Sequence, residues 1–377
     1  MRHFSAGSYR KQTGGYQSFS PGYINKQWIL EDPEILLLLS QADRELGKLD
    51  MFSNYIPNVD LFISMHVVKE ATNSSRIEGT KTNIQEAVME KSDIDPEKRD
   101  DWQEVQQYIK AMNFAIEKLE QLPLSSRLIR ETHHILLSNT RGKNKQPGAF
   151  RTSQNWIGGA TLKDAAFIPP HYSEVQSLMR DLEKFMHNDE IKVPHLIKIA
   201  LIHYQFETIH PFLDGNGRIG RLLITLYLVS FDLLKRPTLY LSEFLEKHRA
   251  VYFDNLSAVR RHNELTPWLK FFLVGIIETA AKACTTFDQI LSLRQRVETE
   301  KILPLGSRAP KARLLLDHLY QHPIVDAQDV AETTGYSMPS AYQLLDNFQQ
   351  LGILQEQTGF QRNRKFVFRE YLDLFGA

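Results

Sequence analysis

The chain of 377 residues has one cysteine, no net charge and no long apolar run. Cys284 cannot form an intramolecular disulfide, and its apolar helical surroundings favour a buried structural thiol over a nucleophile. Because 45 basic residues balance 45 acidic ones, net charge gives no reason to expect nucleic acid or an anionic membrane as the main partner. The longest apolar stretches, such as 222–231, fall short of the roughly 20 residues of a membrane span. The first residues lack the apolar segment of a signal peptide, so we expect a cytoplasmic protein with no membrane partner.

Helical spacing of apolar residues dominates what the sequence does contain. The length exceeds that of most single domains, so a main domain and a smaller one are expected. Residues 1–25 resemble a flexible lead-in, and β-like alternation is confined to one predicted hairpin near 156–168, where glycines and a Lys-Asp pair provide turns. The fold class is therefore mainly α. Helices are predicted at 33–46, 59–71 and onward to about 121, then at 173–187, 194–208, 218–234, 242–261 and 267–299.

The last 67 residues or so form a separate pattern. A Pro- and Gly-containing linker at 303–310 precedes predicted helices at 312–321, 327–333 and 340–351, and then a hairpin through 362–368; this order resembles a winged helix. The helix that would enter a DNA groove contains no Lys or Arg, so a docking or dimerising role is at least as well supported as DNA binding. A small basic cluster in the wing keeps DNA contact open: Arg362, Arg364, Lys365 and Arg369.

The segment His210 to Arg221, reading HPFLDGNGRIGR, contains the chemistry of a phosphate site. Gly215 and Gly217 allow backbone N–H groups to face an anion without an intervening Cβ, and the following helix adds the positive end of its dipole. Arg218 and Arg221 lie three residues apart on the first turn of that helix, so both can reach one phosphate chain.

Two further groups suit a reaction at that phosphate chain. Asp214 is placed to hold Mg²⁺, which takes one or two carboxylates together with substrate oxygens. His210, whose ordinary pKa is about 6.5, can accept a proton from an attacking hydroxyl. A metal hydrolase built on His210, Asp214 and His203 is an alternative, but the paired arginines argue against it. The chain contains no GxxxxGK[ST] motif, so a Walker-type site is unsupported.

HPFLDGNGRIGR matches the Fic signature H-x-F-x-(D/E)-G-N-G-R-x-x-R in full, and the chain is identified on this motif as resembling the Fic family. The resemblance implies AMP transfer from ATP to a Ser, Thr or Tyr hydroxyl, with His210 as general base and Asp214 as the Mg²⁺ ligand. Phe212 would point into the core and fix the loop. The residues implied in nucleotide binding here are Gly215, Asn216, Gly217, Arg218, Gly220 and Arg221.

Residues 147–151, PGAFR, resemble the family's PGxFR segment and precede the predicted hairpin, which resembles the family flap. The flap is expected to pair with an extended segment of a target protein, and its residues Ile157, Gly158, Gly159 and Ala160 to line the nucleotide. Tyr252 matches an aromatic residue that contacts adenine, although its helical spacing also suits a core tyrosine.

Residues 74–79, SSRIEG, match the family's inhibitory pattern (S/T)-x-x-x-E-(G/N), with Ser74, Glu78 and Gly79 at its defined positions. A carboxylate brought to Arg221 would form a charge-assisted pair where the γ-phosphate must sit. The resemblance therefore implies an autoinhibited enzyme. Read by itself, SSRIEG is a helix segment that ends at a glycine cap.

The combined prediction is a three-part chain: a helical region at 1–120 with the inhibitory motif, a Fic core at 121–300 and a winged-helix-like unit at 311–377. The predicted activity is protein AMP transfer with ATP and Mg²⁺. Phosphate or phosphocholine transfer, AMP removal and a nucleotide-sensing DNA-binding regulator are the alternatives. A target protein at the flap is the expected partner, and a homodimer is also open.

Overall fold

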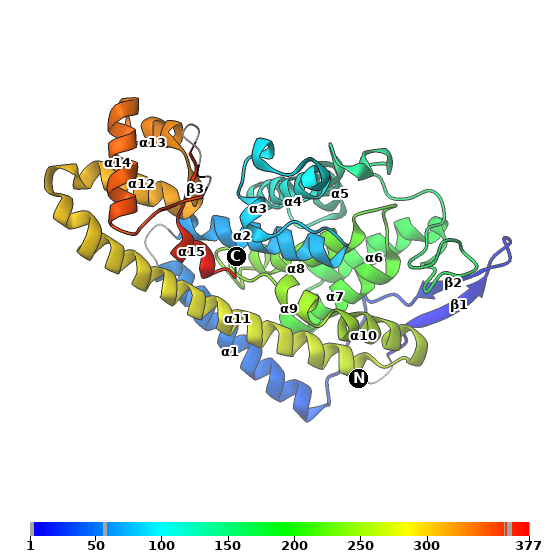
Figure 1. Cartoon of the computed structure of the whole chain (residues 1–377). Helices are drawn as coiled ribbons and strands as arrows, with labels where there is room; N and C mark the ends of the chain where they lie inside the picture. The colour runs from blue at the N-terminus through cyan, green and yellow to red at the C-terminus, as the bar shows by residue number, and fades with distance from the viewer. Residues whose placement is uncertain (1–3, 56–58, 358, 360–363, 377) are drawn as a thin grey trace.

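The computed structural model describes residues 4–55, 59–357, 359 and 364–376, and most of them are helical. Helix α7 (His195–Ile209) is central, since its sequence is mainly apolar and every residue from Leu196 onward is buried. Helix α8 (Asn216–Ser230) packs against it (Figure 1). Around them lie α1 (Pro33–Tyr55), α2 (Asp60–Ile77), α3 (Ile84–Ala87), α4 (Arg99–Lys118), α5 (Ser126–Leu137), α6 (Val175–His187), α9 (Ser242–Lys247), α10 (Arg249–His262) and α11 (Leu265–Arg296).

Helix α1 runs beside the long helix α11, so the first and last thirds of the chain meet along one side of the molecule (Figure 1). The predicted helices lie at these places, and most of their ends are shifted by a few residues. The helices predicted at 33–46 and 59–71 run on to Tyr55 and Ile77, and the predicted helix 242–261 is divided into α9 and α10. No helix among the described residues is long and apolar enough to cross a membrane.

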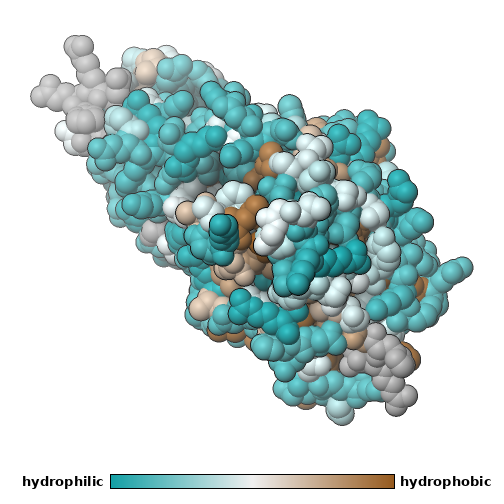
Figure 2. Space-filling model, turned by 90° about the vertical axis from the view of Figure 1, so that its right-hand side faces the viewer, coloured by the Kyte–Doolittle hydropathy of each residue, from teal (hydrophilic) through white to brown (hydrophobic). Residues whose placement is uncertain are grey.

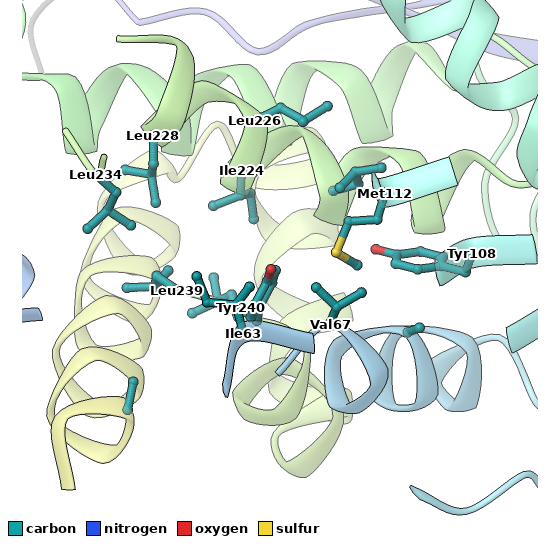
Figure 3. Close-up of a cluster of buried hydrophobic side chains, with 14 of the residues drawn as sticks. Ile63, Val67, Tyr108, Met112, Ile224, Leu226, Leu228, Leu234, Leu239 and Tyr240 are labelled. Carbon is teal, nitrogen blue, oxygen red and sulfur yellow. The ribbon is translucent and has the colours of Figure 1, made fainter. Parts of the chain in front are cut away.

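Helix α2 is wedged between α4, α8 and α9. Figure 3 shows Ile63 and Val67 of α2 facing Tyr108 and Met112 of α4, with Ile224 of α8 above them. Further along, the residues from Glu70 to Ser75 are all buried, although most are polar. The last turn of α2 is therefore held inside the protein by its neighbours and ends beside the N-terminus of α8.

The expected lead-in at 1–25 is wrong. Residues Gly7–Lys11 and Gln17–Pro21 form an antiparallel hairpin, β1 and β2, whose turn contains Gly15 at φ 77°. The amide of Phe19 in β2 donates to the carbonyl oxygen of Ile168 at 2.9 Å. Hairpin formation was missed because β1 is polar and mostly exposed, and β2 becomes buried only against a segment 150 residues away.

The C-terminal part contains α12 (Ala309–Gln321), α13 (Ala327–Thr334), α14 (Met338–Gln350) and α15 (Arg369–Asp373), with a three-stranded sheet in the order β3-β5-β4. The strands are Ile324–Val325, Gln355–Glu356 and Phe366–Val367. Helical turns at Val297–Ile302 and Leu303–Arg308 occupy the place of the expected linker. The order of these elements is helix, strand, two helices, two strands and a short helix. Gly335 ends α13 in the left-handed conformation as its position suggests.

This C-terminal part packs directly on α2. Tyr320 meets Phe62 edge to face with ring centroids 5.1 Å apart, and Phe375 meets His66 at the same separation. Lys365 bridges Glu90, in the segment that follows α2, at 2.7 Å. The unit is therefore fastened both to α2 and to the chain that leaves it.

The described wing cations are largely neutralised within the protein. Lys365 also pairs with Asp326 at 3.0 Å, and Arg364 lies near Glu356 and Asp346. Arg369 lies near Asp373. Arg362, the remaining member of the predicted cluster, lies outside the described residues.

Candidate active site

The loop between α7 and α8 begins with a strained residue. His210 adopts φ 50° and ψ 60°, a left-handed conformation that costs a non-glycine residue of order 1 kcal/mol or more. Arg151 holds it there, since its Nε donates to the His210 carbonyl at 2.9 Å and its backbone amide donates to that of Pro211 at 2.8 Å. Asn155 donates to the Phe212 carbonyl at 2.9 Å.

Two side chains close the loop from within. The Asn216 amide group bonds to both backbone groups of Phe212, each at 2.8 Å. The Phe212 ring stacks on His133, with centroids 3.7 Å apart and planes 7° from parallel. The Nδ1 atom of His133 accepts from the Gly148 amide at 2.8 Å, so Nε2 carries the proton and donates to the Asp214 carbonyl at 2.9 Å.

Arg221 lies almost wholly inside the protein, with 1% of its side chain exposed. Its Nε donates to Ser74 Oγ and its Nη2 to the Ser74 carbonyl, both at 2.8 Å. Nη2 also donates to Glu78 Oε1 at 2.7 Å. Gly79, with φ 106°, ends the helix directly after Glu78. The structure thus brings the inhibitory-pattern residues and the second signature arginine together.

The Glu78 carboxylate lies against the first turn of α8. A Cβ added to Gly217 would be only 2.2 Å from Glu78 Oε1 and 2.9 Å from a guanidinium nitrogen of Arg221. Desolvation would raise the pKa of Glu78, but the charge and hydrogen bond of Arg221, together with the charge of Arg218, keep the pKa below its usual value. An anion therefore occupies the glycine cradle, and 39% of its side chain remains open to solvent.

Arg218 is turned toward other partners in this state. Its Nη1 donates to Glu104 Oε2 at 3.2 Å, and Nη2 lies 3.6 Å from Asp214 Oδ1. Asp214 is 42% exposed and also accepts from the Gly215 amide at 2.6 Å. A single partly exposed carboxylate beside the cradle has the chemistry of a Mg²⁺ ligand that shares the ion with phosphate oxygens.

His210 is set up as a neutral base. Burial, followed by the positive charge of Arg151, lowers the pKa of its imidazole to about 4. The ring is therefore unprotonated at neutral pH and has a lone pair available for a proton.

Three of the sequence-derived positions face away from the cradle. Gly220 turns toward α7, where an added Cβ would be 2.1 Å from Glu207 Oε1, and its carbonyl bonds to His203 Nδ1 at 2.9 Å. Tyr252 is 1% exposed, and its hydroxyl bonds to His203 Nε2 at 2.9 Å. These residues join α7, α8 and α10 in the core, which corrects the nucleotide-facing placement of Gly220 and leaves His203 no free nitrogen for the metal-hydrolase alternative. In the described part of the chain no group of three or more His, Cys, Asp or Glu side chains could hold a metal.

The flap is shorter than the predicted hairpin. Ile157 and Phe167 pair as a single antiparallel bridge, and Gly158 and Gly159 turn the chain with φ 68° and 74°. The Asp164 carboxylate fixes the tip by accepting the amides of Ala160 and Thr161, each at 2.8 Å.

Sequence reasoning gave no role to several residues that shape this site. Arg151 appears in the PGAFR segment but is used entirely for carbonyl groups of the protein itself. His133, Glu104 and Asn155 come from elements far away in sequence. The only available signal was the PGAFR match, because a buried polar residue on a helix face looks like any other until its partner is known.

Comparison with known proteins supports this geometry. The model of the Fic/DOC family N-terminal region matches residues 36–117, and that of the Fic/DOC family matches residues 123–228. Curated relatives include a protein adenylyltransferase Fic from Aedes aegypti, 32% identical over 125 residues, which are 33% of this chain and 22% of the relative. Another, from Drosophila erecta, is 37% identical over 83 residues, 22% of this chain and 15% of the relative. The chain thus matches less than a quarter of the length of these relatives.

Solved structures share the fold. A Fic family protein from Desulfovibrio desulfuricans aligns with a TM-score of 0.57 and 20% identity, covering 91% of this chain and 98% of that one. A Fic domain containing signaling protein from Bacteroides thetaiotaomicron aligns with a TM-score of 0.53 and 18% identity, over 67% of this chain and 97% of its own. Residues 36–117 and 123–228 thus match the two Fic/DOC family models, and the signature loop lies within the second match.

Proposed function

We propose that this chain is a protein adenylyltransferase that transfers AMP from ATP to a protein hydroxyl and is inhibited by its own Glu78. The observation that carries the proposal is the position of the Glu78 carboxylate, which lies on Gly217 and Arg221 at the N-terminus of α8. A site that holds one anion with a glycine, a helix N-terminus and a buried arginine can hold a phosphate in the same way. The names of the curated relatives support the same activity.

In the reaction, the target hydroxyl oxygen attacks the α-phosphorus of ATP while His210 takes the hydroxyl proton. The new oxygen–phosphorus bond replaces the bond to the β-phosphate oxygen, and pyrophosphate leaves. His210 suits this step because its imidazole is neutral and its backbone is locked by Arg151. The protein's contribution is positioning and charge stabilisation, as in other phosphorus transfers.

The cation for this step is assigned to Asp214. Its carboxylate is exposed enough to share Mg²⁺ with phosphate oxygens, and Mg²⁺ when bound would neutralise charge on the leaving pyrophosphate. The backbone amides at Gly215 and Gly217 and the guanidinium groups of Arg218 and Arg221 are the phosphate-binding groups. The Asn216 side chain bonds to both backbone groups of Phe212 and thereby shapes the loop.

Inhibition follows because the Glu78 carboxylate and the terminal phosphate of ATP would occupy the same position on Arg221. While Glu78 pairs with Arg221, the terminal phosphate of ATP has no place on that arginine, and ATP cannot align for attack. Release requires the last turn of α2, held through Ser74, to move or the Glu78 side chain to swing outward. Its solvent-exposed position makes the second movement sterically simple.

The target is proposed to be a protein with an accessible hydroxyl that docks at the flap, and a second copy of this chain is one such target. We assign the reaction to the cytoplasm because the single cysteine offers no disulfide. The described wing cations are paired within the protein, so a DNA-binding role for the C-terminal part is the weaker alternative.

Intact-mass measurement tests donor, activity and inhibition together. Wild type, Glu78→Gly and Glu78→Gly/His210→Ala are incubated with MgATP. We expect a mass gain of one AMP on Glu78→Gly, much less on wild type and none when His210 is also replaced. A gain of one phosphate instead would establish phosphotransfer, and equal labelling of wild type and Glu78→Gly would remove Glu78 from its inhibitory role.

Two rival activities need separate assays. Loss of AMP from pre-labelled protein on addition of wild type would establish removal of AMP as the main reaction. Sequence-specific, salt-sensitive gel shifts by wild type without any AMP transfer from Glu78→Gly would favour a nucleotide-sensing regulator.

A further inference from the structure

The N-terminal hairpin and the flap together border an open groove. It has a volume of about 910 Å³ and is lined on one side by the hairpin turn, including Tyr16, and on the other by Trp156, Lys163 and Ile168 of the flap. Figure 1 shows the hairpin beside the flap region at one end of the molecule. Figure 2, which views this end, shows a hydrophobic patch in the middle of a largely hydrophilic face.

The groove is connected to the catalytic loop by short contacts. The Tyr16 hydroxyl lies 3.4 Å from Gln154 Oε1, and the next residue, Asn155, holds the Phe212 carbonyl of the signature loop. Trp156 follows directly and is 39% exposed, an unusual position for such a large ring. A protein segment whose hydroxyl reaches His210 therefore passes close to the groove.

Backbone pairing determines which edge of the flap is open. Because Ile157 and Phe167 bond to each other, the backbone groups of Trp156, just before this bridge, point outward, and within the described residues they have no hydrogen-bond partner. Gly158, on the other side of the bridge, already turns the chain. On the opposite edge, Ile168 is occupied by Phe19 of the hairpin. An added segment must therefore pair with the flap on the Trp156 side, before the turn at Gly158.

Side-chain alternation then fixes what enters the groove. Successive side chains of a paired strand point to opposite faces, so a target residue that faces the core side, with Ile157, has its two neighbours on the Trp156 face. Trp156 and Ile168 offer apolar surface there. Lys163 at the flap tip is exposed, and it is the one cation among the groove-lining residues; Asp164 beside it is committed to the turn.

We propose that the hairpin–flap groove is the target-selecting surface of this chain and that it takes an extended protein segment with an apolar residue next to the modified one and an acidic residue nearby. Trp156 receives the apolar side chain, and Lys163 pairs with the carboxylate. The proposal rests on the proposed AMP transfer, and it assigns a role to residues 7–21, which lie outside both matched family regions.

A proteolytic digest of a whole proteome provides a suitable probe. Its peptides present hydroxyl residues with many different neighbouring sequences, and none of these residues is buried inside a folded protein. Glu78→Gly is incubated with MgATP and the digest, and AMP-bearing peptides are sequenced by mass spectrometry. We expect acidic residues to be enriched about two- to fivefold within three positions of the modified hydroxyl, the effect of an exposed ion pair. An apolar residue should be enriched at the adjacent positions.

Reversing the charge of Lys163 provides the decisive comparison of peptide preferences. Lys163→Glu in the Glu78→Gly background should shift the preference from acidic to basic flanks, whereas Lys110→Glu, an exposed change on α4, should leave it unaltered. Trp156→Ala should remove the apolar preference and lower total peptide labelling about tenfold, with self-labelling as the check on nucleotide chemistry.

Each outcome separates the two proposals. If Glu78→Gly labels neither itself nor any peptide, AMP transfer itself is wrong. If it labels itself but no peptides, or if peptide preferences are the same in Lys163→Glu and Trp156→Ala as in their parent, the groove does not select targets and this inference is refuted.

Discussion

Arg151→Lys offers the sharpest test of how the catalytic loop is built, because lysine keeps the positive charge but loses the planar fork. The Arg151 side chain is 2% exposed and donates to four carbonyl oxygens: those of His210 at 2.9 Å, Pro170 at 2.6 Å, and Ile209 and Ser153 at 3.3 Å each. A lysine ammonium places its three donors at one point and cannot reach oxygens spread around a guanidinium.

The magnitude follows from the bonds lost. If about two carbonyl groups are left without a donor, at ~1–3 kcal/mol for each unsatisfied buried group, the free energy of unfolding falls by roughly 2–6 kcal/mol. For a chain of 377 residues, the melting temperature should drop by roughly 3–8 °C. The charge that lowers the pKa of His210 is retained, so the base stays neutral and only its position is released.

The kinetic consequence should be confined to kcat. In the Glu78→Gly background, Arg151→Lys should lower kcat for AMP transfer about 10- to 100-fold, the effect of a misplacement of the base by about 1 Å, while KM for ATP stays within about twofold. Arg127→Lys, an exposed change on α5, serves as the matched control. A raised KM with unchanged kcat would identify Arg151 as a phosphate ligand and refute the positioning role, and so would an unaltered melting temperature with unaltered kcat.

Three other changes have defined outcomes. Ser74→Ala removes one of the bonds that anchor the inhibitory helix to a buried arginine, so AMP transfer should rise about fivefold over wild type yet stay below that of Glu78→Gly; a rate equal to wild type would exclude this anchor. Gly220→Ala would place a Cβ 2.1 Å from Glu207 Oε1, so calorimetry should show a loss of ~1–3 kcal/mol in stability, and an unchanged transition would contradict the close packing of α7 and α8. Burial lowers the pKa of four histidines, so they contribute folding stability above their unfolded pKa of about 6.5, and this stability is lost as pH falls toward 4 or below. Glu70 and Glu207, whose pKa values are raised to about 7, have the opposite effect, because the folded protein gains stability from them as pH falls below 7. Replacing one of these histidines by glutamine should flatten the fall in unfolding free energy between pH 6.5 and 4, as denaturant titrations at several pH values would measure. The histidines are His66, with a pKa of about 3, and His133, His203 and His210, each about 4.

Local patterns were sufficient for the helices and for the signature loop. The apolar run of α7 and the glycines of the loop contain their structural information within a few residues, since helix periodicity and left-handed turns are local properties. The pairing of Arg221 with Glu78 could be predicted only through the family pattern, because nothing in local spacing connects residues 143 positions apart.

Features that depend on distant partners were missed or misplaced. The polar hairpin at 7–21 looked unstructured, because the Ile168 carbonyl that anchors it lies far along the chain. A sequence shows which residues are polar, but only the fold shows which of them are hydrogen-bonded to other parts of the protein.

The contact between the C-terminal unit and α2 couples two free energies. Tyr320 and Phe375 rest on the same helix that delivers Glu78 to Arg221, so a ligand that shifts this unit alters the balance between blocked and open states. Thermodynamic linkage is reciprocal: if such a ligand weakens the block and tightens ATP binding by some factor, ATP must tighten the binding of that ligand by the same factor. The nucleotide site and a surface far from it would then respond to one another, with α2 as the element that both of them bias.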